Sequence, residues 1–121
     1  MEQSGPNFTF TRVASGNLDA DPQFRFVQLL GTKDVVLCNS GARADGINQY
    51  KPQDNQHATV AYAGVSKITY GQSLGVGVYI CPGASGVAVL ATSGHIGGKT
   101  TAAANSGNVG ECVILHQTGA I

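Results

Sequence analysis

The segment Gly71–Gly75 matches the G-x-S-x-G pattern that surrounds the nucleophilic serine of many hydrolases. That pattern needs a sharp turn between a strand and a helix, with an acid and a histidine later in the chain. Here a strand-like run follows, and Glu111 is the only later carboxylate. Glu111 and His116 would lie on one short strand, five residues apart, so their side chains would point to opposite faces. We therefore interpret Ser73 as part of a hairpin turn and predict no catalytic residue.

A second motif, Gly94–Thr100, ends in Gly-Lys-Thr, as a phosphate-binding loop does. Ser93 stands where the motif requires its first glycine. No aspartate follows that could hold the magnesium ion used in phosphoryl chemistry. We interpret the segment as a glycine-rich turn with Lys99 exposed, and we predict no nucleotide and no other cofactor.

The residues that bind metals or form disulfides are widely scattered. No C-x-x-C or H-x-x-x-H pair is present to begin a zinc site among Cys38, Cys81, Cys112, His57, His95 and His116. Each cysteine lies in an apolar run, where cysteine commonly packs as a small hydrophobic residue. We predict no metal site and no disulfide framework.

The elements that carry these residues must be short. The 121 residues include 17 Gly and 4 Pro, a density that excludes a helical bundle because these residues interrupt amphipathic helices. The sequence instead predicts one all-β domain, a small β-sandwich or barrel. The expected strands are Phe24–Leu30, Val35–Cys38, Thr59–Tyr62, Ser66–Tyr70, Gly77–Cys81, Val87–Ala91 and Glu111–His116. The segment Lys99–Asn105 is the one place where a single helical turn is expected.

An internal repeat is visible at an offset of 53 residues. The run Val35–Gly41 aligns with Ala88–Gly94 and is identical at four of seven positions, while Thr59–Ala61 aligns with Cys112–Ile114. The repeat predicts two similar β units that pack on one core. Chance similarity between glycine-punctuated strands is the alternative.

Residues 1–23 differ from the domain that we assign to residues 24–121. Aromatic residues and threonines alternate in Asn7–Val13, and a polar linker with Gly16 and Pro22 follows. The sequence predicts an extended N-terminal arm that is mobile in the free protein, because it contains too little apolar surface to order itself. An ordinary first strand is the alternative.

The charge balance excludes some partners. Seven basic and seven acidic residues give zero net charge, and only 12% of residues are charged, about half the usual share. Such a surface lacks the basic footprint of a nucleic-acid binder and suits a protein covered by other subunits. No apolar stretch approaches 18 residues and the start is not basic, so we expect no membrane span, no signal peptide and a cytoplasmic protein.

A series of strand and turn motifs runs through the chain: Phe24–Leu29, Val35–Leu37, Asp45–Ile47, Ala58–Val65, Leu74–Tyr79, Ser85–Val89 and Ile96–Ala104, then Gly107, Val109, Glu111 and Val113. This series resembles the small capsid decoration (cement) proteins of tailed bacteriophages over roughly residues 24 to 116. It departs from them at Lys99-Thr100 and in Asn48–Gln56. The resemblance implies a non-enzymatic structural protein, often trimeric, that binds the major capsid protein on the outer surface of the virion.

Five residues are candidates for capsid or subunit contact. Phe8, Phe10 and Arg12 belong to the arm, which we expect to reach an adjacent subunit, and Phe24 and Arg25 follow the linker. The expected protein is made in the host cytoplasm, assembles as a homo-oligomer and bridges capsid subunits. A tail or fibre structural module is one alternative. A small ligand-binding or enzymatic β domain is another, although the sequence lacks the convergent titratable groups that it should contain.

Overall fold

The structure is a computed structural model that describes residues 7–14, 24–30, 34–49, 57–91 and 95–118. Within these ranges it contains nine strands and one short 3-10 turn, η2 (Ala84–Gly86). The strands are β1 (Asn7–Ala14), β2 (Phe26–Leu30), β3 (Asp34–Leu37), β4 (Gly46–Asn48), β5 (His57–Thr69), β6 (Tyr79–Pro82), β7 (Ala88–Leu90), β8 (His95–Thr100) and β9 (Val109–Thr118). The prediction of an all-β fold is therefore confirmed.

The first five strands form a closed ring of pairings. β3 lies between β1 and β2, β4 lies between β2 and β5, and β1 closes the ring by pairing antiparallel with β5. The contact between β1 and β3 is parallel, whereas the other pairings are antiparallel. We call this unit the first ring.

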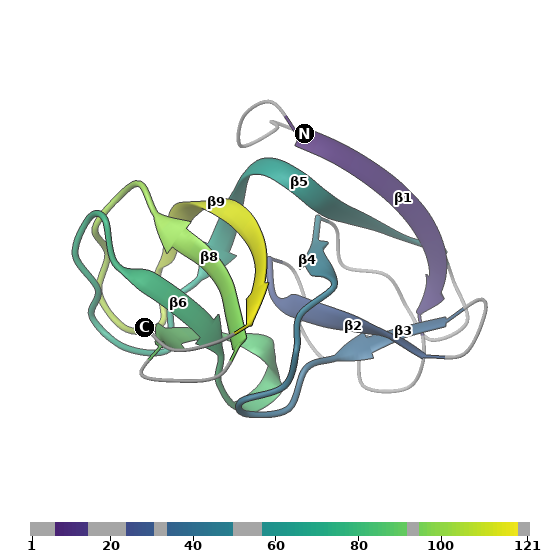
Figure 1. The fold of residues 1–121 in the computed structure, drawn as a ribbon, viewed down its shortest axis with the longest axis horizontal. Coiled ribbons are helices and arrows are strands. Elements are labelled where there is room, and N and C mark those ends of the chain that lie inside the picture. Colours follow the sequence, from purple (N-terminus) through teal and green to yellow (C-terminus); the bar gives the residue numbers. More distant parts are fainter. Residues whose placement is uncertain (1–6, 15–23, 31–33, 50–56, 92–94, 119–121) are drawn as a thin grey trace.

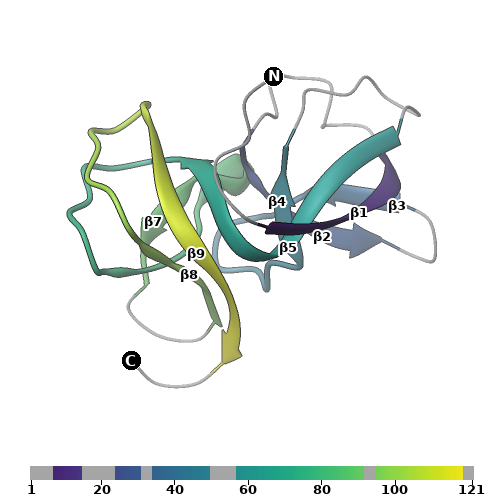
Figure 2. The same ribbon diagram turned by 90° about the horizontal axis from the view of Figure 1, so that it is seen from above.

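A second ring uses the end of β5 and the last four strands. β9 pairs with residues Val65–Thr69 of β5, followed in order by β8, β6 and β7. A parallel bridge from Tyr70, just after β5, to Ala88 of β7 completes the ring. Figures 1 and 2 show β1–β4 on one side of the molecule and β6–β9 on the other, with β5 running between them.

The strand register repeats between the rings. Val27 pairs with Leu37 in the first ring, and Ile80 pairs with Leu90 in the second, 53 residues later in each case. The remaining pairs of the β6–β7 ladder keep the same offset from the β2–β3 ladder. The predicted duplication is thus confirmed, and the two units also share one sheet through β5.

Two apolar clusters fill the rings. Val27, Val35, Leu37 and Val60 form the cluster of the first ring, against which Phe10 packs. The larger cluster includes Phe26, Ile47, Ile68, Tyr70, Ile80 and Cys112, so it joins residues of both rings. Since neighbouring residues of β2 enter different clusters, this strand contributes both of its faces to the interior.

Glycines allow the two rings to approach closely. A Cβ on Gly97 of β8 would lie 2.8 Å from the ring of Phe26, and a Cβ on Gly86 would meet the backbone carbonyl of Phe26. In the second ring, a Cβ on Gly110 would overlap the buried ring of Tyr70, whose hydroxyl donates to the carbonyl of Ala102 at 2.5 Å. These contacts explain why Gly97 and Gly110 lie inside strands and why Gly86 lies in the η2 turn.

Several predicted elements need correction. The two strands expected at Thr59–Tyr62 and Ser66–Tyr70 are one strand, β5, which continues through Gly64 with a φ of 92°. β4 and β8 were not expected. The helical turn predicted at Lys99–Asn105 is wrong, because its first two residues end β8, and the short helical turn lies at Ala84–Gly86 instead.

Part of the predicted arm is a strand of the first ring. Residues Asn7–Ala14 are extended, as expected, but they pair with β5 and β3 of their own chain. Within this range the ordinary first strand, our alternative, is the correct interpretation. The rest of the arm, residues 1–6 and 15–23, lies outside the described residues. Among the described residues, no helix has the length and apolar character to cross a membrane.

Candidate functional site

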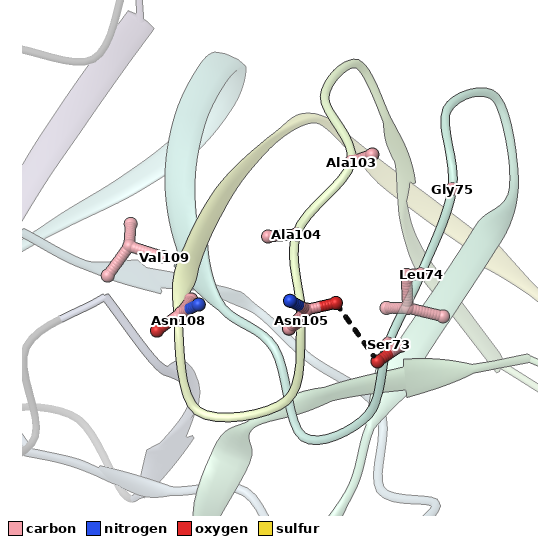
Figure 3. Close-up of a pocket in the computed structure, with 8 residues that line it drawn as sticks. All are labelled: Ser73, Leu74, Gly75, Ala103, Ala104, Asn105, Asn108 and Val109. Atoms are coloured by element: carbon pink, nitrogen blue, oxygen red, sulfur yellow. Dashed lines mark hydrogen bonds between the residues drawn. The ribbon is translucent and has the colours of Figure 1, made fainter.

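Ser73 lies on an exposed loop that leads from β5 into β6. Its Oγ donates to Oδ1 of Asn105 at 3.4 Å (Figure 3). Leu74 then forms a bridge with Ala104, and the next regular element is a strand. The context of a nucleophile elbow, a strand followed by a helix, is not met here.

An open hollow of about 570 Å³ lies beside Ser73. Its lining combines one hydroxyl, two amides and small apolar side chains: Ser73, Leu74, Gly75, Ala103, Ala104, Asn105, Asn108 and Val109 (Figure 3). None of these side chains can act as a general base near neutral pH. The lining therefore offers hydroxyl, amide and apolar groups.

A second hollow of about 420 Å³ adjoins the first and shares Ala103 and Val109 with it. Its charged residues are Lys67 and Glu111, which face each other across the β5–β9 ladder. The Lys67 ammonium lies 5.9 Å from the centre of the Phe24 ring, and Glu111 accepts a 2.8 Å hydrogen bond from the Thr101 hydroxyl. Both charges thus already have partners that hold them on the surface of the sheet.

Lys99 lies within β8 rather than in a turn, so that part of the prediction is wrong. The side chain is exposed, as expected, and its ammonium lies 5.5 Å from the centre of the Tyr79 ring. The preceding Gly97 and Gly98 pack against Phe26 and against β9. These glycines leave room for the core, whereas those of a phosphate-binding loop approach a ligand.

The three cysteines are free thiols, and two are fully buried. Burial raises the pKa of Cys38 to about 12, with a smaller contribution from the nearby charge of Asp45. Burial likewise raises the pKa of Cys112 to about 12, and it raises that of the half-buried Cys81. Because the thiolate is the reactive form, these values agree with the predicted packing role.

The thiols provide a first test. At pH 8 a pKa of about 12 leaves roughly one thiol in 10⁴ ionised, so we expect Cys38 and Cys112 to resist a thiol reagent in the folded protein. Cys81 should react alone, and all three should react in urea. Rapid native labelling of two or more thiols would contradict the burial.

The same shifts make stability depend on alkaline pH. The folded state favours the neutral thiols, so their contribution is complete below the ordinary pKa of 9.0 and is lost as pH rises toward about 12. We expect the urea midpoint to fall over this interval. In a Cys112→Ala variant the fall should be smaller, and an equal fall would contradict this assignment.

Phe8 and Phe10 lie together, and sequence reasoning missed their third partner, Tyr62. The Tyr62 ring centre lies 6.4 Å from that of Phe8 and 5.6 Å from that of Phe10. Phe10 packs on the first-ring cluster, whereas Phe8 is 66% exposed and Tyr62 is 40% exposed. We call these three residues the aromatic patch. Tyr62 lies two positions after Val60 in β5, so the two side chains share one face of the strand. Because Phe10 packs on the cluster that contains Val60, this spacing could have placed Tyr62 beside Phe10.

The other predicted contact residues lie elsewhere. Arg12 pairs with Ala58 in the β1–β5 ladder, and its side chain is outside the described residues. Phe24 is largely buried with a φ of 58°, and its carbonyl accepts a 2.8 Å hydrogen bond from Thr69 of β5. Arg25 donates from Nη1 to the carbonyl of Ser85 at 3.2 Å. Phe24 and Arg25 therefore tie the rings together, whereas Phe8 faces solvent.

Within the described ranges, no three His, Cys, Asp or Glu side chains are grouped so that they could hold a metal ion. The main surface features of the described ranges are the aromatic patch and the two hollows.

Comparison with known proteins relates the fold to a solved structure. The sequence matches no family profile and no curated protein. The structure is similar to the crystal structure of the N base of head fiber gp8.5 of bacteriophage phi29, with a TM-score of 0.74 and 17% identity. The likeness covers 92% of this chain and 96% of the other. At this identity the likeness establishes a shared fold over nearly the whole of both chains.

Proposed function

We propose that this protein is a structural component of a bacteriophage head that attaches to the outer surface of the capsid. The observation that carries the proposal is the likeness to the base of a phage head fibre, which extends over nearly all of both chains. The resemblance of the sequence to small capsid decoration proteins agrees with this proposal. The major capsid protein is the proposed partner.

The surface chemistry supports this role. Only 12% of the residues are charged and the net charge is zero, so covering the surface removes few charges from water. Phe8 and Tyr62 offer exposed aromatic area, which is typical of the centre of protein interfaces. A trimer that bridges capsid subunits would make three such contacts, and their combined strength would exceed that of any one of them.

A fibre base is the second candidate function. The specific observation in its favour is that the solved structure is the N base of a fibre. A decoration protein would bind heads and stabilise them by itself, whereas a fibre base would bind heads and also hold a fibre. Retention of a distal fibre segment on heads by this protein would favour the second function.

Cosedimentation with empty, expanded phage heads is the direct test. We expect binding to the heads to saturate, because a structural component of a head occupies a fixed number of sites. Heads saturated with the protein should also resist heat better than bare heads. Absence of binding to the heads of the phage that encodes the protein would contradict the proposed function.

The aromatic patch gives a sharper prediction. Replacing Phe8 by alanine removes an exposed ring, and we expect head affinity to fall about tenfold or more, since burying a phenylalanine contributes about 1.5–3 kcal/mol. Val76→Ala is the matched control, because Val76 is 65% exposed but lies on the β5–β6 loop. Equal effects of the two variants would rule out the patch as the contact.

The proposed oligomer has its own test. Sedimentation equilibrium at micromolar concentration should give three times the chain mass of 12.4 kDa. A single-chain mass at that concentration would contradict the trimer, while leaving head binding to be judged by cosedimentation.

A further inference from the structure

One edge of β5 is divided between two other strands. β1 pairs with His57–Gly64, and β9 pairs with Val65–Thr69. The two ladders therefore meet end to end, with Asn7 of β1 opposite Gly64 and the β9 ladder beginning one residue later. Each strand limits how far the other can extend along β5.

β9 already reaches beyond this boundary. If its register on β5 continued past the pair of Val65 and Val113, His116 would lie opposite Tyr62. In the structure His116 donates from Nε2 to the carbonyl of Tyr62 at 2.6 Å. Tyr62 is also the extra residue of a bulge in the β1 ladder, where Thr9 pairs with Ala61 and Phe8 with Ala63. β9 thus already contacts β5 within the part of its edge that β1 occupies.

The side chains of β1 that the structure describes contribute little to the core. Phe10 packs on the first-ring cluster, while Phe8 and Thr9 are exposed. The backbone ladder with β5 runs along the strand from Asn7 to Val13, and any identical strand reproduces it. A second copy of β1 would restore every contact that the first copy gives up.

The two rings differ in the strand that closes them. In the second ring, the place of β1 is taken by the end of β5 itself, which pairs antiparallel with β9 and reaches β7 through Tyr70. That closing strand is continuous with the sheet on both sides. β1 is instead a separate strand that is joined to the ring by its pairings with β5 and β3. The first ring is therefore the ring whose closing strand can leave without breaking another strand.

The geometry points to β1 as an exchangeable strand, whose acceptor is the His57–Gly64 edge of β5 in a second copy of this chain. While this edge is vacant, β9 extends along β5 from its contact at Tyr62 and covers the part of the edge that adjoins the β9 ladder. Exchange of β1 then links protomers without any new interface chemistry. This inference rests on the proposed function only in that it supplies the subunit contacts of the proposed oligomer.

Disulfide trapping in mixed full-length proteins tests the exchange. Thr11 and Thr59 are Cα partners in the β1–β5 ladder, a spacing that a disulfide can bridge. One protein would carry Thr11→Cys and the other Thr59→Cys, both in a Cys81→Ala background that removes the least buried native thiol. After the two are mixed and oxidised, we expect a covalent dimer. At complete exchange, about half of the acceptor rings would contain the other copy's strand.

The matched control replaces Thr69 by cysteine. It is a half-buried threonine of the same strand, but it pairs with Val109 of β9 and not with β1. A mixture of Thr11→Cys and Thr69→Cys should give no specific dimer. If the first pair of variants folds poorly, Phe8→Cys with Ala63→Cys repeats the test at another matched position.

The outcomes separate this inference from the proposed function. If the double variant Thr11→Cys/Thr59→Cys closes within single chains and the mixture gives no more dimer than the Thr69 control, the exchange is wrong. The proposed function would then still be tested separately, by cosedimentation with heads. Trapped dimers without any head binding would support the exchange and contradict the proposed function.

Discussion

Replacing Phe26 by alanine is expected to lower the free energy of unfolding by about 3–5 kcal/mol, the usual cost of truncating a fully buried phenylalanine. Phe26 has no exposed surface, and its ring lies against Gly97 of the second ring of strands while its own strand belongs to the first. The alanine variant would leave a cavity at the junction of the two rings. Urea unfolding followed by circular dichroism would measure the loss.

Two further variants make this result interpretable. Phe26→Leu keeps most of the volume, so it should lose less and remain folded if the alanine variant does not. Leu90→Ala truncates a large apolar residue that is 44% exposed, and we expect a loss of about 1 kcal/mol or less. A loss at Phe26→Ala no larger than that at Leu90→Ala would contradict the role of Phe26 as the residue that joins the rings.

The fold class could be predicted because glycine spacing and apolar runs are local properties. The strand boundaries could not, because glycines inside strands are read as turns. In the sequence Gly64 predicts a break, but in the structure it adopts a positive φ within β5, and the next residue begins the ladder with β9. Gly97 and Gly98 obscured β8 for a different reason, since they make room for Phe26 and for the carbonyl of Val113.

β4 was not predicted, because a strand of three residues is too short to show a pattern. Its three residues, Gly46–Asn48, are all buried, so they show neither alternation nor a helical period. A Cβ on Gly46 would overlap Val60 and the Ala61 carbonyl of β5, and this close approach is invisible in the sequence. The repeat did not help either, because β4 occupies in the first ring the place that β8 occupies in the second, and β8 was not expected.

The candidate contact surface was only partly predictable. Alternation in Asn7–Val13 identifies a strand and the face on which Phe8 and Phe10 lie, but it does not identify the edge with which that strand pairs. That edge is β5 of the same chain, and it brings Tyr62 beside the two phenylalanines. Long-range pairing of this kind depends on the whole ring, and so a local pattern could not distinguish an arm from a first strand.

Gly86→Ala is expected to have the second large effect. Gly86 has a φ of 77°, which alanine adopts at a cost of roughly 1–2 kcal/mol. In addition, a Cβ at this buried position would meet the backbone carbonyl and nitrogen of Phe26. Backbone cannot rotate away as a side chain can, so β2 or the η2 turn would have to shift, adding about 1–3 kcal/mol or more.

Gly41→Ala separates these two causes. Gly41 has the same φ of 77°, but a Cβ there would meet nothing within 4 Å. The Gly41 variant should therefore show only the conformational cost, while Gly86→Ala should unfold at a clearly lower urea concentration with an unchanged m-value. Because η2 belongs to the second ring and β2 to the first, the difference between the two variants measures how tightly the rings are joined at this point. Equal destabilisation by both substitutions would mean that the rings can separate here at little cost, and that other contacts such as that of Phe26 with Gly97 hold the junction together.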